Sequence, residues 1–226
     1  LDFTRQLSSL TAEEFMAWMK ERLGVVHLCT GYDFALGRNR GGTLPVLRQI
    51  GEKLGYTVDT IGPIPDQQNE AISSSRIRDL LTQGEVHAAA DLLGRRYFVD
   101  GVITHGDGRG HNLGFPTANI AVPRQRLAPG YGIYTTWITL QGEQNVRLPS
   151  VTSIGVRPTF EDQPVLPRIE AHILDLPDDP DLYDRPVRLE FVEFLRPELR
   201  FPNAQALIDQ IRMDIQRSRE VFSHDR

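Results

Sequence analysis

The chain has 226 residues, of which 40% are hydrophobic and 24% charged, values typical of a globular protein with a sizeable core. Its 25 Lys and Arg residues and 30 Asp and Glu residues give a net charge of −5, which argues against a nucleic-acid coat or a polybasic membrane binder. The single cysteine, Cys29, excludes an internal disulfide framework and a Cys-x-x-Cys zinc site. Apolar runs are too short to span a membrane and no leader sequence opens the chain, so we expect a cytoplasmic protein.

Two further features concern the start of the chain and its lysines. The chain begins at Leu1 rather than at Met, so we expect a trimmed protein or a fragment. Its only lysines are Lys20 and Lys53. A site formed by later residues must therefore work without a lysine amine.

The first part of the chain reads as alternating helices and strands. Thr11 and Glu14 have the spacing of a capping box, which predicts a helix through about Leu23. Gly55 is placed to end a second helix. The expected elements are helices over 11–23, 44–54, 75–82 and 85–93, with strands over 25–30 and 56–61. Strands that alternate with helices indicate a parallel sheet with crossover connections.

After residue 94 the pattern changes to short strands of period two. Turn residues separate these strands, and Asn203 is placed to cap a final helix whose apolar face carries Leu207, Ile208, Ile211 and Ile215. The expected strands are 97–104, 132–140, 147–154, 168–174 and 187–194. This arrangement predicts an all-β antiparallel barrel or sandwich with a C-terminal helix, and a domain boundary that divides the chain into 1–93 and 94–226.

A glycine-rich segment follows the first of these strands. Gly106, Gly108 and Gly110 would let backbone N–H groups approach a phosphate closely, although a flexible hairpin tip has the same composition. The segment is no dinucleotide fingerprint, because it does not open a helix, and it lacks the Gly-Lys-Ser/Thr of a P-loop.

Thr117 and Asn119 come next, after Pro116. Residues two apart in an extended chain project to the same side. A hydroxyl and an amide carbonyl are hard oxygen ligands that suit Mg²⁺. The pattern predicts a magnesium site formed by Thr117 and Asn119.

The run from Leu113 to Ile120, Leu-Gly-Phe-Pro-Thr-Ala-Asn-Ile, resembles the signature of riboflavin kinases. The resemblance implies that Thr117 and Asn119 hold Mg-ATP beside the glycine-rich loop. It also implies nucleotide-binding roles for Gly114 and Pro116 and suggests that Arg109 assists at the phosphates.

Later segments resemble the same family in order along the chain. Residues 153–160, which include Arg157, resemble its next turn, and residues 169–175 resemble the strand that carries its catalytic glutamate, which falls on Glu170. Residues 181–183 match a further turn, after which Asp184 stands where the family usually has Gly. Arg196 lies in a segment, 195–201, that resembles the one near the flavin.

Glu170 can also be interpreted from its own surroundings. Ile169, Ala171 and Ile173 alternate with it, so one face of the strand is apolar and the other carries Glu170 and His172. A solvated strand face has the same pattern. With the resemblance, Glu170 becomes the general base for the ribityl 5′-hydroxyl of riboflavin.

Two segments of the first part resemble the adenylyltransferase half of bacterial bifunctional riboflavin kinase/FAD synthetases. One runs from Gly31 to Gly37 and includes Asp33 and Phe34; the other runs from Ile72 to Arg78. Hydroxyls at a helix start with an arginine one turn later suit an anion such as the ATP triphosphate, although an ordinary helix cap looks alike. The candidate residues of the second segment are Ser73, Ser74, Ser75, Arg76 and Arg78.

A histidine motif of that half, His-x-Gly-His, is absent, because no two of the six histidines lie three apart. In the family this motif precedes the position of Leu1. Residues 1–93 are therefore expected to be the back half of a Rossmann-like nucleotidyltransferase domain without FMN adenylyltransferase activity. The function expected for the chain is that of riboflavin kinase, with riboflavin and ATP as substrates, Mg²⁺ as cofactor and no nucleic-acid or membrane partner. The alternative is a flavin- or nucleotide-binding remnant without catalysis.

Overall fold

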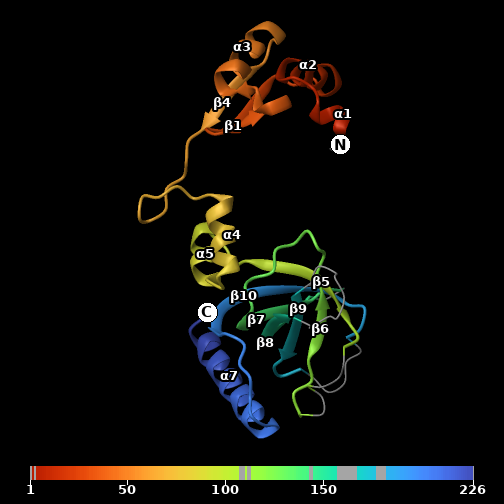
Figure 1. The fold of residues 1–226 in the computed structure, drawn as a ribbon, viewed down its shortest axis with the longest axis vertical. Helices are drawn as coiled ribbons and strands as arrows, with labels where there is room; N and C mark the ends of the chain where they lie inside the picture. Colours follow the sequence, from red (N-terminus) through yellow and green to blue (C-terminus); the bar gives the residue numbers. More distant parts are fainter. Residues whose placement is uncertain are drawn as a thin grey trace. The chain divides into compact units, whose positions relative to one another are not determined.

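The computed structural model describes residues 2, 4–106, 110, 113–142, 145–156, 167–176 and 182–225. They form two compact units, unit 1 (Leu1–Ile72) and unit 2 (Ser73–Arg226), and each is described by itself (Figure 1). None of the described helices combines the length and the apolar character needed to cross a membrane.

Unit 1 is a small α/β arrangement. The capping box predicted at the start of α2 is present, since Thr11 N–H donates to the Glu14 carboxylate (2.8 Å) and Glu14 N–H donates to the Thr11 hydroxyl (3.2 Å). Strands β1 and β4 pair in parallel, as predicted. Met16, Leu47 and other buried side chains form its core. The elements are α1 (Arg5–Ser8), α2 (Ala12–Leu23), β1 (His27–Gly31), β2 (Ala35–Leu36), η1 (Arg38–Arg40), β3 (Gly42–Thr43), α3 (Leu44–Leu54) and β4 (Thr57–Ile61).

Unit 2 contains a closed antiparallel barrel with the strand order β10-β5-β6-β9-β8-β7. Five of its strands lie where the period-two pattern predicts them. The sixth, β6, is not among the predicted strands, because four residues are too few to establish a period. The strands are β5 (Phe98–Thr104), β6 (Ala118–Ala121), β7 (Gly132–Leu140), β8 (Val146–Val156), β9 (Pro167–Ile173) and β10 (Pro186–Arg196).

Alternation along the strands separates the inside of the barrel from its outer face. Inward-facing side chains such as Tyr134, Ile154, Ile169 and Phe191 form one continuous core. Their neighbours in sequence must point outward, since successive side chains of a strand alternate. On β9 the outward residues are Arg168, Glu170 and His172, and on β6 Asn119 points outward.

Helices α4 (Ser74–Thr82) and α5 (Val86–Leu93) belong to unit 2 (Figure 1). Leu81, Val86 and Ala89 are buried in the same cluster as the barrel core. The compact units therefore divide after Ile72, earlier than the boundary at 93/94 drawn from the change in sequence pattern. The physical reason is that the apolar faces of these two helices are buried against barrel residues.

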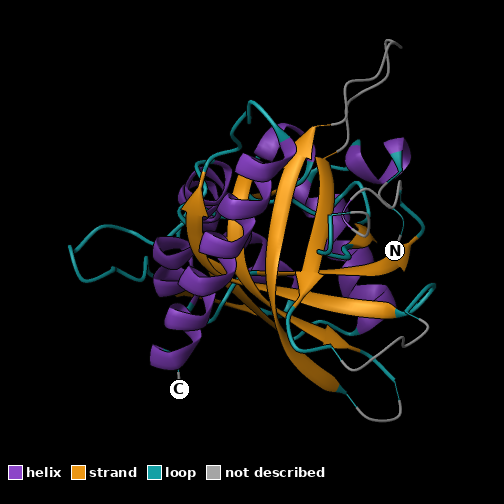
Figure 2. Cartoon of the chain, turned by 90° about the horizontal axis from the view of Figure 1, so that it is seen from below, coloured by secondary structure: helices purple, strands orange, loops and turns teal. Residues whose placement is uncertain are grey.

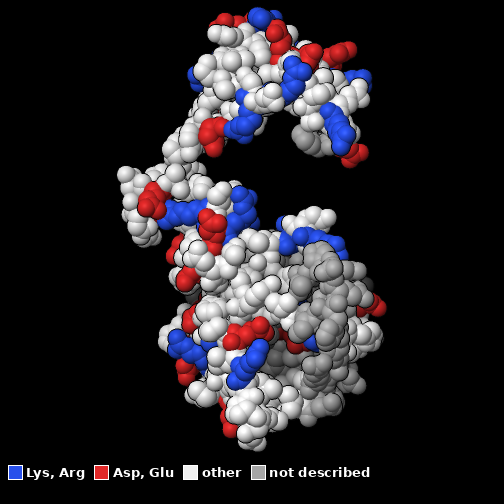
Figure 3. Space-filling model, in the orientation of Figure 1, with Lys and Arg blue, Asp and Glu red and all other residues white. Residues whose placement is uncertain are grey.

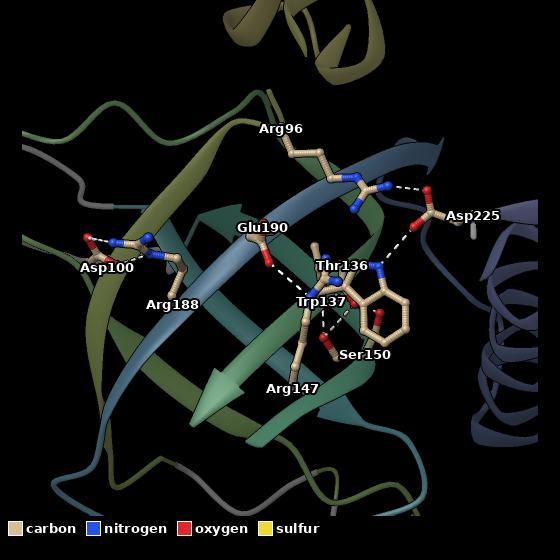
Figure 4. Close-up of polar contacts among 9 residues, drawn as sticks. All are labelled: Arg96, Asp100, Thr136, Trp137, Arg147, Ser150, Arg188, Glu190 and Asp225. Carbon is tan, nitrogen blue, oxygen red and sulfur yellow. Dashed lines mark hydrogen bonds and ion pairs between the residues drawn. The ribbon is translucent and has the colours of Figure 1, made fainter. Parts of the chain in front are cut away.

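Helix α7 (Ala204–His224) lies along the outside of the barrel (Figure 2). Asn203 caps it as predicted, because its side-chain oxygen accepts from Ala206 N–H (2.9 Å). At the other end, Asp225 accepts from the Trp137 indole N–H (2.9 Å) and pairs with Arg96 (Figure 4). The barrel and the helix are thus tied by polar contacts as well as by packing.

Much of the charge on the outer face of unit 2 is paired. Arg188 makes two bonds to Asp100 (2.7 and 3.1 Å), and Arg147 bonds to Glu190 (3.1 Å) while stacking over Trp137 (Figure 4). On the face shown in Figure 3, acidic and basic side chains of unit 2 are interspersed.

Candidate active site

A cavity of about 340 Å³ lies on the outer face of the barrel, between strands β8 and β9 and the segment that leads from β10 into α7. It has a polar wall and an apolar wall. The polar wall is formed by Gly110, Thr117, Ser153, Arg168, Glu170 and His172. The apolar wall is formed by Leu113, Phe115, Ile133, Val151, Leu199, Phe201, Leu207 and Ile211, and Arg196, Glu198 and Asp214 complete the lining.

Glu170 lies in the middle of three paired strands. Its direct cross-strand neighbours are Asn119 on β6 and Ser153 on β8. Because both pairs share the outer face, strand pairing places the Asn119 amide beside the Glu170 carboxylate. The Glu170 side chain is 27% exposed, so it borders the cavity and remains accessible from it.

Arg168 joins these two side chains. Its Nε–H donates to Asn119 Oδ1 (3.3 Å), and its Nη2 forms an ion pair with Glu170 Oε1. Nε and Nη2 form one edge of the planar guanidinium, which is shaped to bind two oxygens at once. One cation therefore bridges the two functional groups that the sequence assigns to the base and to the metal.

The segment from Phe115 to Asn119 is held in place from both sides. The His172 Nδ1–H donates to the Pro116 carbonyl (2.8 Å), and the His172 ring meets the Phe115 ring edge-on. Phe115 N–H donates to the Gly110 carbonyl (2.9 Å). These contacts fix the backbone on which Thr117 and Asn119 stand, so His172 has a positioning role that its place on the strand did not reveal.

Two glycines near this segment are required by close packing. A Cβ at Gly106 would overlap the amide of Asn119, and a Cβ at Gly110 would overlap the carbonyl of Phe115. Gly114 has φ +84°, which favours glycine. Gly108, Arg109 and Arg157 lie outside the described residues.

Arg196, expected from the sequence to bind a ligand, lines the cavity but is held by another side chain. Its Nε and Nη2 donate to Asp214 of α7 (3.0 and 2.7 Å), and Nη1 donates to the Pro197 carbonyl (3.0 Å). Asp214 is only 7% exposed. The contacts in the structure show this arginine holding α7 onto β10 beside the apolar wall.

The candidate residues of the first part fall into different units. Asp33 and Phe34 lie in a turn of unit 1, where Arg40 donates to the Asp33 carbonyl (3.0 Å). Ser73 begins unit 2 and caps α4, because its hydroxyl accepts from Arg76 N–H (3.3 Å). Arg78 donates to the Ser75 hydroxyl (3.2 Å), and Ser74 is exposed at the same helix start. The structure gives the positions of Asp33 and Phe34 within unit 1 and those of the Ser73–Arg78 segment within unit 2.

Sequence reasoning did not single out Arg168, and it named Glu198 only as part of the segment 195–201. Arg168 could have been noticed, because it is two residues before Glu170 and must share its face. The resemblance of the segment 195–201 to the one near the flavin was the signal for Glu198, which lines the cavity. Glu198 approaches the barrel because Gly155 has no side chain: a Cβ there would overlap the Glu198 carboxylate.

The chemistry that this cavity can support follows from its two walls. Leucine, isoleucine, valine and phenylalanine side chains favour a flat apolar group, whereas carboxylates, hydroxyls and an arginine favour a polar tail. A carboxylate at the polar end can accept a proton from an alcohol. The cavity therefore suits an amphipathic alcohol.

Comparisons with known proteins agree with these features. The riboflavin kinase family model matches residues 93–222, and the FAD synthetase family model matches residues 1–76. A bifunctional riboflavin kinase/FMN adenylyltransferase of Listeria monocytogenes is 34% identical over 98% of this chain and 68% of the relative. The protein of the same name from Bacillus subtilis is 33% identical over the same shares.

One solved structure resembles the chain over nearly all of its length. It is a crystal structure described as that of a macrolide-efflux protein from Streptococcus pneumoniae, with a TM-score of 0.83 and 29% identity. The match covers 97% of this chain and 68% of the other. The fold is therefore shared with a protein of known structure.

Proposed function

Because the chain belongs to the riboflavin kinase family, we propose that the cavity of unit 2 is where it transfers the γ-phosphoryl group of ATP to the ribityl 5′-hydroxyl of riboflavin. The enzyme is a riboflavin kinase, and its product is FMN. The assignment of residues to this reaction rests on one observation. Strand pairing sets Asn119 directly beside Glu170, which lines the polar wall of the cavity.

Glu170 is proposed as the general base. Its carboxylate borders the cavity and can accept the proton of the 5′-hydroxyl as the oxygen attacks the γ-phosphorus. The bond between that phosphorus and the bridging oxygen of ATP breaks, and the leaving electron pair stays on ADP. The Glu170 side chain is held by a strand that is paired on both sides, so the base is fixed before the substrate arrives.

Thr117 and Asn119 are proposed to hold Mg²⁺ together with the ATP phosphates. The donor set fits this ion, because a hydroxyl and an amide carbonyl are hard oxygen ligands. Two neutral oxygens and substrate phosphates form the kind of open, oxygen-only site that Mg²⁺ accepts. When bound, the ion neutralises charge on the transferring phosphoryl group.

The glycine-rich segment is proposed to cover the ATP phosphates. Gly106 and Gly110 already allow close approach of the backbone to Asn119 and to Phe115. Gly108, Gly114, Pro116, Arg109 and Arg157 are proposed to complete the nucleotide site. Backbone N–H groups and arginines suit this task in a part of the chain without lysines.

The apolar wall is proposed to bind the flavin ring. Leu199, Phe201, Leu207 and Ile211 come from the segment before α7 and from its first turns. The Arg196–Asp214 pair holds that helix on β10. In this arrangement Arg196 is proposed to act on the ligand by orienting the flavin wall.

Replacing Glu170 by Gln tests the proposal and separates it from a binding remnant without catalysis. FMN formation, followed by chromatography, should fall by roughly 10²–10⁴-fold, since this is the usual contribution of a general base. Riboflavin binding, followed by flavin fluorescence, should stay close to that of the unaltered protein. Glu190→Gln is the matched control, because Glu190 pairs with Arg147 and does not line the cavity.

A Glu170→Gln protein that kept half of the original rate would contradict the role of Glu170. If the unaltered chain bound riboflavin and Mg-ATP but formed no FMN at all, the remnant interpretation would hold instead.

We further propose that residues 1–93 are the C-terminal portion of an FMN adenylyltransferase domain and that 94–226 are the riboflavin kinase domain. The FAD synthetase match over residues 1–76 supports the first assignment. Asp33 and Phe34 in unit 1, and separately the Ser73–Arg78 segment at the start of unit 2, are proposed to handle nucleotide. Without a His-x-Gly-His motif in its sequence, the 226-residue chain is expected to make FMN and no FAD. Incubation with FMN, ATP and Mg²⁺, followed by chromatography, tests this.

Because ATP is the phosphate donor and Cys29 is a free thiol, we also propose a cytoplasmic location.

A further inference from the structure

We propose that Arg168 is a positioning residue that serves as the resident cation of the nucleotide-free site: it holds the Glu170 carboxylate and competes with Mg²⁺ for the oxygen of Asn119. The inference rests on the proposed roles of these two residues. It is carried by the bridge that Arg168 makes between them. One guanidinium edge contacts Asn119 Oδ1 (3.3 Å) and is ion-paired with Glu170 Oε1.

The bridge joins residues that only the closed barrel brings together. Arg168 and Asn119 are 49 positions apart in the sequence and meet because β6 and β9 are paired. Arg168 and Glu170 are each about one quarter exposed, at 28% and 27%, so water screens their attraction only in part. The contact therefore holds the base and the amide in one arrangement before any ligand enters.

The other charged groups of the cavity do not provide this cation. Among the described lining residues, Arg196 carries the other guanidinium, and that group is bound to Asp214. Besides Glu170 and the Asp214 bound to Arg196, Glu198 adds a third carboxylate to the cavity, and it lies against Gly155, the cross-strand neighbour of Arg168. His172 is directed to the Pro116 carbonyl. Among the lining residues that the structure describes, Arg168 is thus the cation placed to offset the charge of the Glu170 carboxylate.

The consequence is a competition between two cations. The guanidinium on Asn119 Oδ1 is a cation, so it repels a second cation that binds the same oxygen, and its ion pair with Glu170 makes that carboxylate a weaker base. A metal-bound nucleotide that uses the Asn119 oxygen has to loosen the guanidinium from it. Removing Arg168 should therefore lower the Mg²⁺ concentration that the protein needs in order to bind nucleotide.

Titration of the full chain with Mg²⁺ at fixed ADP measures this directly, with binding followed by calorimetry. For Arg168→Gln, the Mg²⁺ concentration at half-saturation should fall by roughly three- to tenfold, the effect of losing one partly screened charge contact. Arg168→Lys keeps the charge but offers one donor centre in place of a fork, so its value should lie between those of the other two proteins. If Arg168→Gln does not fold, this lysine variant decides the question alone.

A second readout needs no nucleotide. The melting temperature of Arg168→Gln should rise on addition of Mg²⁺ alone, by more than that of the unaltered chain, because two oxygens have lost their cation. Arg188→Gln is the matched control, since Arg188 makes a comparable pair with Asp100 and does not line the cavity (Figure 4). It should leave the Mg²⁺ requirement unchanged.

An unchanged or increased Mg²⁺ requirement in Arg168→Gln would overturn the inference; weaker ADP binding at every Mg²⁺ concentration would do so too, and would place Arg168 on the phosphates. The proposed function fails in a different way. In that case Asn119→Ala and Glu170→Gln would leave Mg-ADP binding and turnover unaltered, whatever Arg168→Gln does.

Discussion

The two compact units differ in how their strands are completed. In unit 2 six strands close into a barrel, so every strand is paired on both sides. In unit 1, as far as the structure describes it, β1 and β4 pair only with each other, and β2 pairs with β3. A closed barrel can support side chains on its outer face without losing its core. In unit 2 the candidate residues Asn119 and Glu170 stand on paired strands, whereas Asp33 and Phe34 of unit 1 stand in the segment between β1 and β2.

The cores of the units differ in the same direction. Unit 2 buries one continuous cluster that includes α4 and α5 as well as the barrel. Unit 1 buries a smaller cluster centred on Met16 and Leu47, and Val26, Ile61 and Ile64 are among its exposed apolar residues. Unit 2 should therefore be the more stable part of the chain.

The largest expected effect concerns where unit 2 begins. A chain that starts at Ser73 should keep riboflavin kinase turnover, whereas a chain that starts at Gly94 should lose most of its stability. Leu81 and Val86 are each 1% exposed, and their removal forfeits about 3–6 kcal/mol of apolar burial, a large share of a typical folding free energy. Thermal melting of the two shortened chains measures the difference.

Packing under the two helices gives the reason for this expectation. Gly84 lies against the Tyr134 hydroxyl and the Phe194 ring, and burial raises the pKa of Tyr134 to about 12. Without the helices these aromatic side chains would meet water. Equal melting temperatures for the two shortened chains would show that the family boundary near residue 93 is also the boundary of folding.

A smaller effect should follow from Asp214→Ala. This change leaves the Arg196 guanidinium, 14% exposed, without its carboxylate, and removing one partner of a buried pair costs about 3–5 kcal/mol. Because α7 supplies part of the apolar wall, the KM for riboflavin should rise more than the KM for ATP. Steady-state kinetics with each substrate varied in turn measures the two constants. A matched change on the outer face, Asp100→Ala, should leave both KM values unaltered. If Asp214→Ala raised the two KM values equally, the proposed role of α7 in flavin binding would be contradicted.

The smallest expected effect compares one carboxylate in each unit. A side-chain hydrogen bond from Arg219 lowers the pKa of Asp175 in unit 2, and the backbone hydrogen bond from Thr11 lowers the pKa of Glu14 in unit 1. A lowered folded-state pKa gives stability that is present above the unfolded value, about 4, and is lost as pH falls through the folded value.

Both units should therefore lose part of their stability below about pH 4. Asp175→Asn should weaken this acid dependence in unit 2 alone, and Glu14→Gln should weaken it in unit 1 alone. Melting curves between pH 5 and pH 2 show the change. If either variant altered the acid dependence of both units equally, the two units would not unfold independently.

Local signals in the sequence were enough for much of the fold. The Thr11–Glu14 capping box, the Asn203 cap and the period-two strands all depend on residues close together in the chain, and the structure contains them. The alternation around Glu170 likewise indicated a polar outer face on β9. The family motifs named Thr117 and Asn119, and strand pairing set Asn119 beside Glu170.

Tertiary structure alone decided which of these groups touch. The Arg168–Asn119 contact joins positions 49 apart, the Arg196–Asp214 pair joins a strand to a helix, and the docking of α4 and α5 extends unit 2 back to Ser73. Local patterns fix which way a side chain faces, because the periods of helices and strands are properties of the backbone. They do not fix its neighbour across the sheet, because that depends on how the strands are ordered when the barrel closes.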